Sequence, residues 1–96
     1  MDTLTMNIAR EFFAAIVDGT KRIEYRELKP YWKVRIEPMT TPFKLRLLNG
    51  MTPPIPEAVV EVKRVTRHPA EGEYRLHLGR VLCVRHWNRR AKKPTR

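Results

Sequence analysis

The segment 58–66 reads AVVEVKRVT, and its four valines make it the stretch that decides the fold. Valine is β-branched and packs well on the surface of a pleated sheet. We therefore predict that this segment is a central strand. The rest of the chain can be placed by working outward from it in both directions.

Strands are predicted on both sides of this segment. After a turn at 68–72, segment 74–84 opens with YRLHL, whose alternation of apolar and polar residues is typical of a half-buried strand. The apolar run continues to Val84, and Gly79 indicates a bulge where the strand bends. Segment 43–47 (FKLRL) alternates in the same way and predicts a strand before the central one.

A further strand is predicted in segment 21–28, which reads KRIEYREL. Alternate residues of a strand point to opposite faces of the sheet. Ile23 and Tyr25 are therefore expected to face the core. Glu24 and Arg26 are expected to lie together on the polar face.

The N-terminal part of the chain predicts a short strand followed by a helix. Residues 3–7 alternate apolar and polar side chains. Ile8, Phe12 and Ile16 then recur every four residues, which predicts one apolar stripe on a helix of about three turns. Gly19 ends this helix, as glycine commonly does at a helix C-terminus.

The predicted order is strand, helix, and then four or five strands, without the βαβ alternation of a parallel sheet. We expect an α+β fold, with a small, mostly antiparallel, curved sheet or barrel and one N-terminal helix packed against it. Segment 31–36 fits a helical turn and a strand equally well. One domain, residues 1–84, is expected to be followed by a basic C-terminal tail, residues 85–96.

Charge is distributed unevenly along the chain. The formal net charge is +10, and residues 80–96 carry seven of the 20 lysines and arginines and none of the ten acids. A polyanion is the natural partner of such a segment, with Arg85, Arg89 and Arg90 as candidate contacts. A tail that only improves solubility is the plain alternative. Trp87 fits stacking on a base and anchoring of the tail equally well.

Several classes of protein are disfavoured. No apolar run approaches the roughly 20 residues that cross a bilayer, and the N-terminus does not resemble a secretory signal. Cys83 is the only cysteine, so no disulfide can form within the chain. We expect a cytoplasmic protein that does not bind membranes. His68, His77 and His86 recur every nine residues, which matches no common metal-site spacing, so no metal or cofactor is expected.

Residues 19–26 read GTKRIEYR, and this G-x-K-x-x-E-x-R pattern directly after a helix resembles the ASCH family of the PUA-like superfamily. Segments 45–50 (LRLLNG) and 77–82 (HLGRVL) agree with the resemblance, which covers residues 3–84. It implies a PUA-like β-barrel with a cleft beside the motif, and it implies RNA binding. Some members of the family are enzymes that hydrolyse acetylated cytidine or cleave RNA. Lys21 matches the catalytic lysine of the first kind, Glu24 stands in place of its threonine, and the helical insertion that carries its glutamate is absent.

The residue types of the motif suit a nucleotide. Lys21 can act as a point charge for phosphate, and Arg26 offers a fork of donors for a phosphate or a base edge. Glu24 can accept hydrogen bonds from an exocyclic amine or orient the two cations. Trp32 can stack on an unpaired base or form the rim of the core. Arg46 and Asn49 are further candidates for the lining of the cleft.

Three functions remain open on the sequence alone. The first is an RNA-binding module without catalysis, in which the basic tail adds affinity that does not depend on sequence. The second is a small hydrolase of RNA or a modified nucleoside, with Lys21 and Glu24 as the reactive pair. The third is a domain that binds an acidic protein. Charge and resemblance favour the first, with RNA ahead of DNA, while the oligomeric state stays open.

Overall fold

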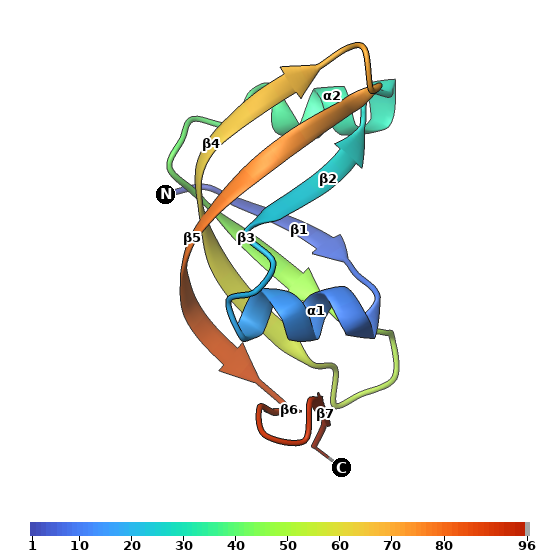
Figure 1. The fold of residues 1–96 in the computed structure, drawn as a ribbon, viewed down its shortest axis with the longest axis vertical. Helices are drawn as coiled ribbons and strands as arrows, with labels where there is room; N and C mark the ends of the chain where they lie inside the picture. The colour runs from blue at the N-terminus through green and yellow to red at the C-terminus, as the bar shows by residue number, and fades with distance from the viewer. Residues whose placement is uncertain (96) are drawn as a thin grey trace.

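In a computed structural model that describes residues 1–95, the chain is an α+β protein built on a five-stranded sheet. The strand order is β1-β3-β4-β5-β2, and the sheet curls into a half-barrel (Figure 1). The sheet consists of β1 (Thr3–Asn7), β2 (Ile23–Glu27), β3 (Phe43–Leu48), β4 (Glu57–His68) and β5 (Glu73–Arg85).

The sheet is mixed but mostly antiparallel. Only β1 and β3 pair in parallel, and the remaining neighbours in this sheet are antiparallel. The long β4–β5 pair changes register repeatedly where Val59 to Arg64 face His77 to Cys83. Gly79 lies in this stretch, as predicted for a bulge, and a Cβ there would collide with the Glu61 carboxylate. The bend lets two long strands take part in both halves of the curled sheet (Figure 1).

Two helices accompany the sheet, α1 (Arg10–Val17) and α2 (Pro30–Ile36). The expectation of a single helix is therefore wrong. Pro30 begins α2, where its missing N–H has no intrahelical partner to lose and its fixed φ already suits a helix. This settles the segment whose pattern fitted helix and strand equally.

The core lies on the inner face of the sheet. Phe43, Leu45 and Leu47 on β3 are fully buried, as are Leu76 and Val62 on the neighbouring strands β5 and β4. Burying one such side chain is worth roughly 1.5–3 kcal/mol. The alternation read from the sequence therefore identified the buried face of these strands correctly.

Helix α1 buries a different face from the predicted one. Phe13, Ile16 and Val17 are buried, whereas Phe12 is 46% exposed, so its assignment to the core is wrong. Residues 13, 16 and 17 follow the i, i+3, i+4 spacing of one helix face. Phe12 lies to the side of that face and lines a pocket at the edge of the sheet.

Strand β2 is also turned over relative to the prediction. Glu24 is 4% exposed and pairs in register with the buried Leu76, whereas Tyr25 is 43% exposed and pairs with Arg75. The assignment of Tyr25 to the core is therefore wrong. The register with β5 determines this orientation, because each β2 side chain points to the same face as its partner on β5.

The chain after β5 folds back as a small hairpin of β6 (Trp87–Asn88) and β7 (Lys93–Pro94). Trp87 is 8% exposed, and its ring lies 4.7 Å from that of Phe13 in α1. Lys92 adds an ion pair with Asp18, with a nitrogen-to-oxygen distance of 3.3 Å. Trp87 therefore anchors the C-terminal segment to α1, which was one of the two roles expected from the sequence. Residues 85–95 of the predicted tail are folded. Arg96 lies outside the described residues.

The two adjacent phenylalanines of α1 should respond very differently to truncation. Phe13→Ala removes a fully buried ring that also supports Trp87, and it should lower the free energy of unfolding by about 3–5 kcal/mol. Phe12→Ala should lower it by at most about 1 kcal/mol, because that ring is half exposed. Urea unfolding of both variants measures the difference. Equal losses would show that the assigned helix face is wrong.

Candidate functional site

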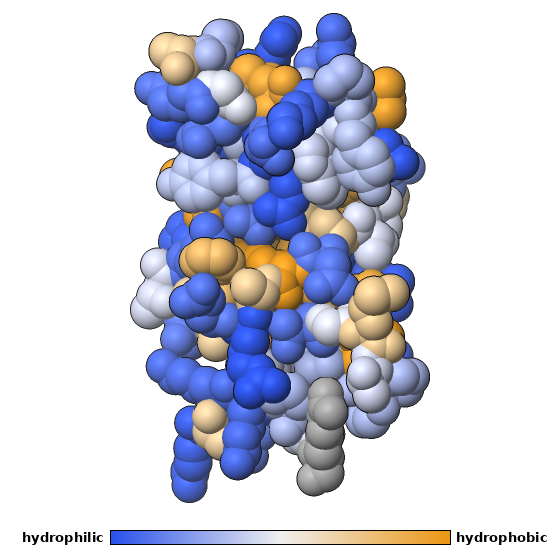
Figure 2. All heavy atoms as spheres, turned by 90° about the vertical axis from the view of Figure 1, so that its right-hand side faces the viewer, coloured by the Kyte–Doolittle hydropathy of each residue, from blue (hydrophilic) through white to orange (hydrophobic). Residues whose placement is uncertain are grey.

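The half-barrel has a seam where β1 and β2, the two ends of the strand order, approach each other without being sheet neighbours. Two pockets lie along this seam, and both are lined by Asn7, Tyr25 and Arg26. Helix α1 lies toward one end of the seam and α2 toward the other (Figure 1). Figure 2 shows the side of the molecule that carries both helices, where apolar surface gathers near the middle between hydrophilic regions.

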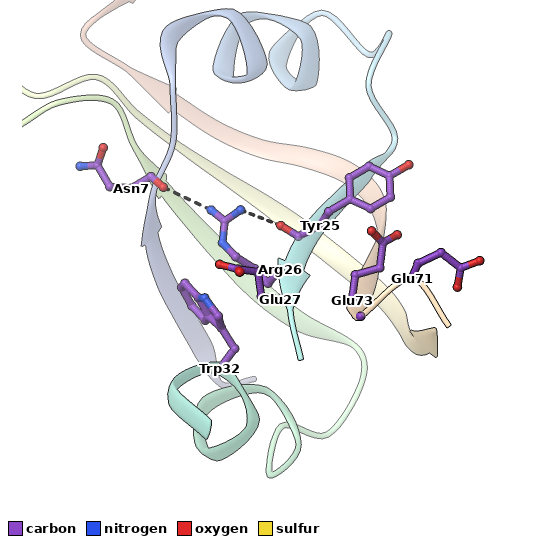
Figure 3. Close-up of a pocket in the computed structure, with 8 residues that line it drawn as sticks. Asn7, Tyr25, Arg26, Glu27, Trp32, Glu71 and Glu73 are labelled. Carbon is purple, nitrogen blue, oxygen red and sulfur yellow. Dashed lines mark hydrogen bonds between the residues drawn. The ribbon is translucent and has the colours of Figure 1, made fainter. Parts of the chain in front are cut away.

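The Arg26 guanidinium bridges the two edges of the seam. Its Nη2 donates to the backbone oxygen of Asn7 on β1 at 3.2 Å, and its Nη1 donates to the Tyr25 carbonyl at 2.7 Å (Figure 3). The guanidinium carbon lies 5.2 Å from the centre of the Trp32 ring, a cation–π distance. Arg26 thus stands as a bar between two cavities, which we call the α1-side pocket and the α2-side pocket.

The α1-side pocket has a volume of about 560 Å³. Lys21 stands in its wall with its ammonium 5.3 Å from the Phe12 ring centre and 4.9 Å from that of Tyr25. The end of α1 holds Lys21 in place. Its backbone N–H donates to the Ala15 carbonyl at 3.0 Å, and Gly19, with φ of +87°, makes the turn that brings it there. The pocket therefore combines a fixed cation with two half-exposed aromatic rings.

Glu24 is the buried acid of this pocket. Its Oε1 accepts a hydrogen bond from the Tyr25 N–H at 3.0 Å and lies 3.5 Å from the Lys21 ammonium. Its Oε2 lies 3.4 Å from Nη1 of Arg26, but it accepts no hydrogen bond from any described residue. A buried polar atom left without a hydrogen bond costs about 1–3 kcal/mol. A ligand that donated a hydrogen bond to this oxygen would remove that cost.

The α2-side pocket, of about 540 Å³, has the opposite electrostatic character. Three carboxylates line it together with Trp32, namely Glu27, Glu71 and Glu73 (Figure 3). Glu27 pairs with Lys29 at 2.9 Å, and Glu73 pairs with Arg75 at 2.7 Å. A phosphate group is therefore favoured in the pocket that holds Lys21 and disfavoured in this one.

The structure brings four of the sequence-predicted site residues together at the seam: Lys21, Glu24, Arg26 and Trp32. Arg46 and Asn49 line neither of these pockets. Arg46 donates a hydrogen bond to Glu57 at 2.9 Å, which raises the pKa of Arg46 and lowers the pKa of Glu57.

Asn49 has a positioning role close to the seam. Its Nδ2 donates to the Ile8 carbonyl at 3.0 Å, at the link between β1 and α1. Asn7 extends the same tie, because its Nδ2 donates to the Gly50 carbonyl at 3.0 Å. The two amides hold the end of β1, where Arg26 finds its acceptor, against the loop after β3.

The remaining candidates lie at the C-terminal end of the molecule. Arg85, Arg89 and Arg90 are exposed, at the end of β5 and in the turn between β6 and β7. This end lies beyond α1 in Figure 1, so these cations form a basic surface separate from the seam.

Several lining residues were not recognised as site residues from the sequence, among them Asn7, the three glutamates of the α2-side pocket, and two aromatic residues, Phe12 and Tyr25. The predicted helix stripe includes Phe12, and the predicted strand alternation turns Tyr25 toward the core. A signal was available in both places: Phe12 is followed by a second phenylalanine on a short helix, and Tyr25 is flanked by charged residues on both sides. An aromatic ring among cations is a candidate for stacking on a base.

The chain matches no protein-family model, and no curated protein or solved structure matches it. Within residues 1–95, no helix is long and apolar enough to cross a membrane. Over the same residues, no three histidine, cysteine, aspartate or glutamate side chains gather in a group that could hold a metal ion.

The hydrogen bonds by which Arg26 links β1 and β2 should depend on the planar shape of its guanidinium as well as on its charge. Arg26→Lys keeps the charge, but one ammonium cannot reach both carbonyl acceptors in the manner of the planar fork. We expect a loss of about 1–2 kcal/mol in the free energy of unfolding and faster amide hydrogen exchange in β1.

Arg80→Lys is the matched control for this variant, because Arg80 is exposed on β5 and its side chain forms no hydrogen bond or ion pair with any other described residue. It should leave both measurements close to those of the wild type. If both lysine variants behave alike, Arg26 does not hold the seam together.

Proposed function

We propose that this protein is a binding module for single-stranded nucleic acid, RNA in the first place, and that an unpaired nucleotide occupies the seam. The observation that carries the proposal is Glu24, a carboxylate 4% exposed between Lys21 and Arg26, with one oxygen that accepts no hydrogen bond from the described residues. A buried acid flanked by two cations suits a ligand that carries both hydrogen-bond donors and negative charge. A nucleotide with an amino group on its base is such a ligand.

The α1-side pocket offers separate places for phosphate and base. Lys21 and Arg26 are the cations of this pocket, and both can bind a phosphate oxygen. Phe12 and Tyr25 present half-exposed rings on which a base can stack. The volume of about 560 Å³ is within the range of small-ligand sites.

The unsatisfied oxygen of Glu24 gives the site a preference among bases. Cytosine, adenine and guanine carry an exocyclic amine that can donate to it, whereas uracil presents carbonyl oxygens on the corresponding edge. A carbonyl placed against a buried carboxylate oxygen leaves two acceptors facing each other. The seam is therefore expected to favour amino-bearing bases over uracil.

The proposal includes membership of the ASCH family and a PUA-like barrel. The support is the position of residues 19–26, which follow α1 and line the seam of a half-barrel, as the resemblance implies. The exposed arginines of the C-terminal hairpin add affinity through contacts with the phosphate backbone. Such contacts do not depend on the base sequence.

One contact favours a second candidate function, the hydrolysis of RNA or a modified nucleoside. The Lys21 ammonium lies 3.5 Å from Oε1 of the buried Glu24. An amine and a carboxylate at this separation can exchange a proton during a reaction. The second function would use the same pocket, so binding and turnover have to be measured together.

The test uses short RNAs of a single base, oligo(C), oligo(A) and oligo(U), with binding and product formation measured on the same samples. Lys21→Ala and Arg26→Ala should each weaken binding of oligo(C) by about 1–3 kcal/mol. Glu24→Gln replaces an acceptor-only group by one that can donate or accept, so the preference for oligo(C) over oligo(U) should largely disappear. Lys44→Ala removes one cation of β3 outside both seam pockets and is the matched control.

The outcomes separate the two functions. A module without catalysis gives no product, and all effects appear in the affinity. An enzyme gives product with the wild type and loses turnover in Glu24→Gln while the RNA still binds. If all three seam variants match the control on every RNA, the seam is not the binding site.

A further inference from the structure

A second group of cations lies on the outer face of the sheet, opposite the core. The registers of β2, β5 and β4 place their outward side chains in rows of three. From one end to the other, the rows are Ile23–His77–Arg64, Tyr25–Arg75–Thr66 and Glu27–Glu73–His68. We call this surface the outer face.

At the centre of the cation group, one hydroxyl lies between two imidazoles. Thr66 Oγ1 lies 2.8 Å from Nε2 of His68 and 2.9 Å from Nε2 of His77. A hydroxyl has one hydrogen to donate, so it donates to one ring and accepts from the other when both histidines are neutral. A protonated imidazole donates from both ring nitrogens, so it can donate one hydrogen bond to Thr66 and another to an anion.

The charge on the outer face runs from positive to negative. Lys63 and Arg64 are exposed at the His77 end, and neither forms an ion pair among the described residues. Two acids stand in the last row, where Glu73 is held by Arg75. One further acid, Glu61, lies beyond the His77 end, where its carboxylate is next to Gly79 and close to the side chain of Lys63. The His77 end therefore has cations in excess.

His77 has several positively charged neighbours. Burial lowers the pKa of His77 below its ordinary value of 6.5, and the positive charges of Arg64, His68, Lys63 and Arg75 lower it further. The β2 residue beside it in the row is the uncharged Ile23. An anion placed here would interact favourably with all of these groups at once.

Building on the nucleic-acid binding proposed above, on which this inference rests, we propose that the His77 end of the outer face is a phosphate-binding subsite for the next part of a strand that enters the seam. Tyr25 connects the two places, since it lines both seam pockets and also stands in the middle row of the outer face. From β2 to β4 is two strand spacings, about 10 Å. A mononucleotide whose base and phosphate both lie in the α1-side pocket leaves the outer face free, whereas a strand of several nucleotides can extend from the seam onto it.

The subsite makes binding of longer strands depend on pH. A bound phosphate favours the protonated form of His77 and so raises the pKa of His77 in the complex. Binding of the longer strand must then tighten as the pH falls from the pKa of His77 in the complex to its pKa in the free protein. The gain is up to about tenfold per pH unit for one proton taken up. Binding of a mononucleotide confined to the seam should not tighten as the pH falls, because its phosphate monoester loses part of its charge at about pH 6.

The experiment compares cytidine monophosphate with oligo(C) of increasing length, at pH values between 5.5 and 8. Wild-type protein should bind oligo(C) more tightly as the length grows and as the pH falls. His77→Gln should remove the pH slope, and Arg64→Gln should weaken the longer strands about 5- to 50-fold while leaving the mononucleotide unchanged. Lys33→Gln, which removes an exposed cation of α2, should preserve both the slope and the length dependence.

The histidine responsible is identified by a second variant. His86→Asn removes the histidine at the start of the C-terminal hairpin, and asparagine tolerates the positive φ of 56° found there. The proposal is overturned if the slope is lost in His86→Asn and kept in His77→Gln. It is also overturned if poly-glutamate displaces the RNA from the outer face and shows the same slope, because the surface would then be a site for acidic protein.

A direct measurement does not depend on any variant. Histidine ring signals followed by NMR report the pKa of His77 with and without inorganic phosphate or oligo(C). Both should raise the pKa of His77, and an unchanged value in the presence of bound oligo(C) overturns the proposal. Mononucleotide binding tests the seam alone, so failure of the seam and failure of the outer face are seen separately.

Discussion

The whole arrangement depends on the hydrogen bonds by which Arg26 spans the seam. A curled sheet of five strands leaves β1 and β2 as edges, and the unpaired N–H and C=O groups of an edge invite pairing with other chains. Arg26 occupies one of these edge groups, because its side chain extends from β2 and donates a hydrogen bond to a carbonyl of β1. It also divides the space at the seam into two pockets. The same side chain that steadies the fold thus shapes the place where a ligand can enter.

Glu24 compensates the charge of the Arg26 guanidinium at the seam. In turn, Arg26 and Lys21 make it possible for the Glu24 carboxylate to be buried. Taking a single carboxylate out of water costs several kcal/mol, and nearby cations repay this only in part. Both cations stand at about 3.5 Å from Glu24, farther than a short charged hydrogen bond. The two cations therefore stabilise the charge of the carboxylate, while its Oε2 can still accept a hydrogen bond. A site built this way is ordered before its ligand arrives, which lowers the entropic cost of binding.

Much of the fold could be predicted from alternation, because most strands bury one face and expose the other. The buried side chains of β3, the bulge at Gly79 and the helix before Gly19 follow from local pattern alone. Strand β2 could not be predicted in this way. Its orientation depends on pairing with β5, about 50 residues away, and apolarity is a poor guide at a seam that holds a charged cluster.

The site residues also fall into two groups: those that a local sequence motif identifies, and those whose role depends on contacts made in the folded protein. The motif of residues 19–26 identified Lys21, Glu24 and Arg26, and the structure brings these side chains together. The roles of Phe12 and Trp87 depend on contacts with distant residues. Phe13 takes the buried position of α1, so the ring of Phe12 stays half exposed and was wrongly expected in the core. The role of Trp87 became clear only from its contact with Phe13.

That contact between Trp87 and Phe13 has a consequence for multivalent binding. A flexible basic tail would act as a tether, whose effective concentration falls smoothly with its length and which accepts any spacing between two binding sites. Here Trp87 fixes the hairpin to the helix whose other side forms a wall of the seam. The arginines of the hairpin and the seam are thus held at one separation. For the nucleic acid proposed as ligand, this fixed separation predicts a gain in avidity only with strands that match it, and no gain with strands too short or too stiff to do so.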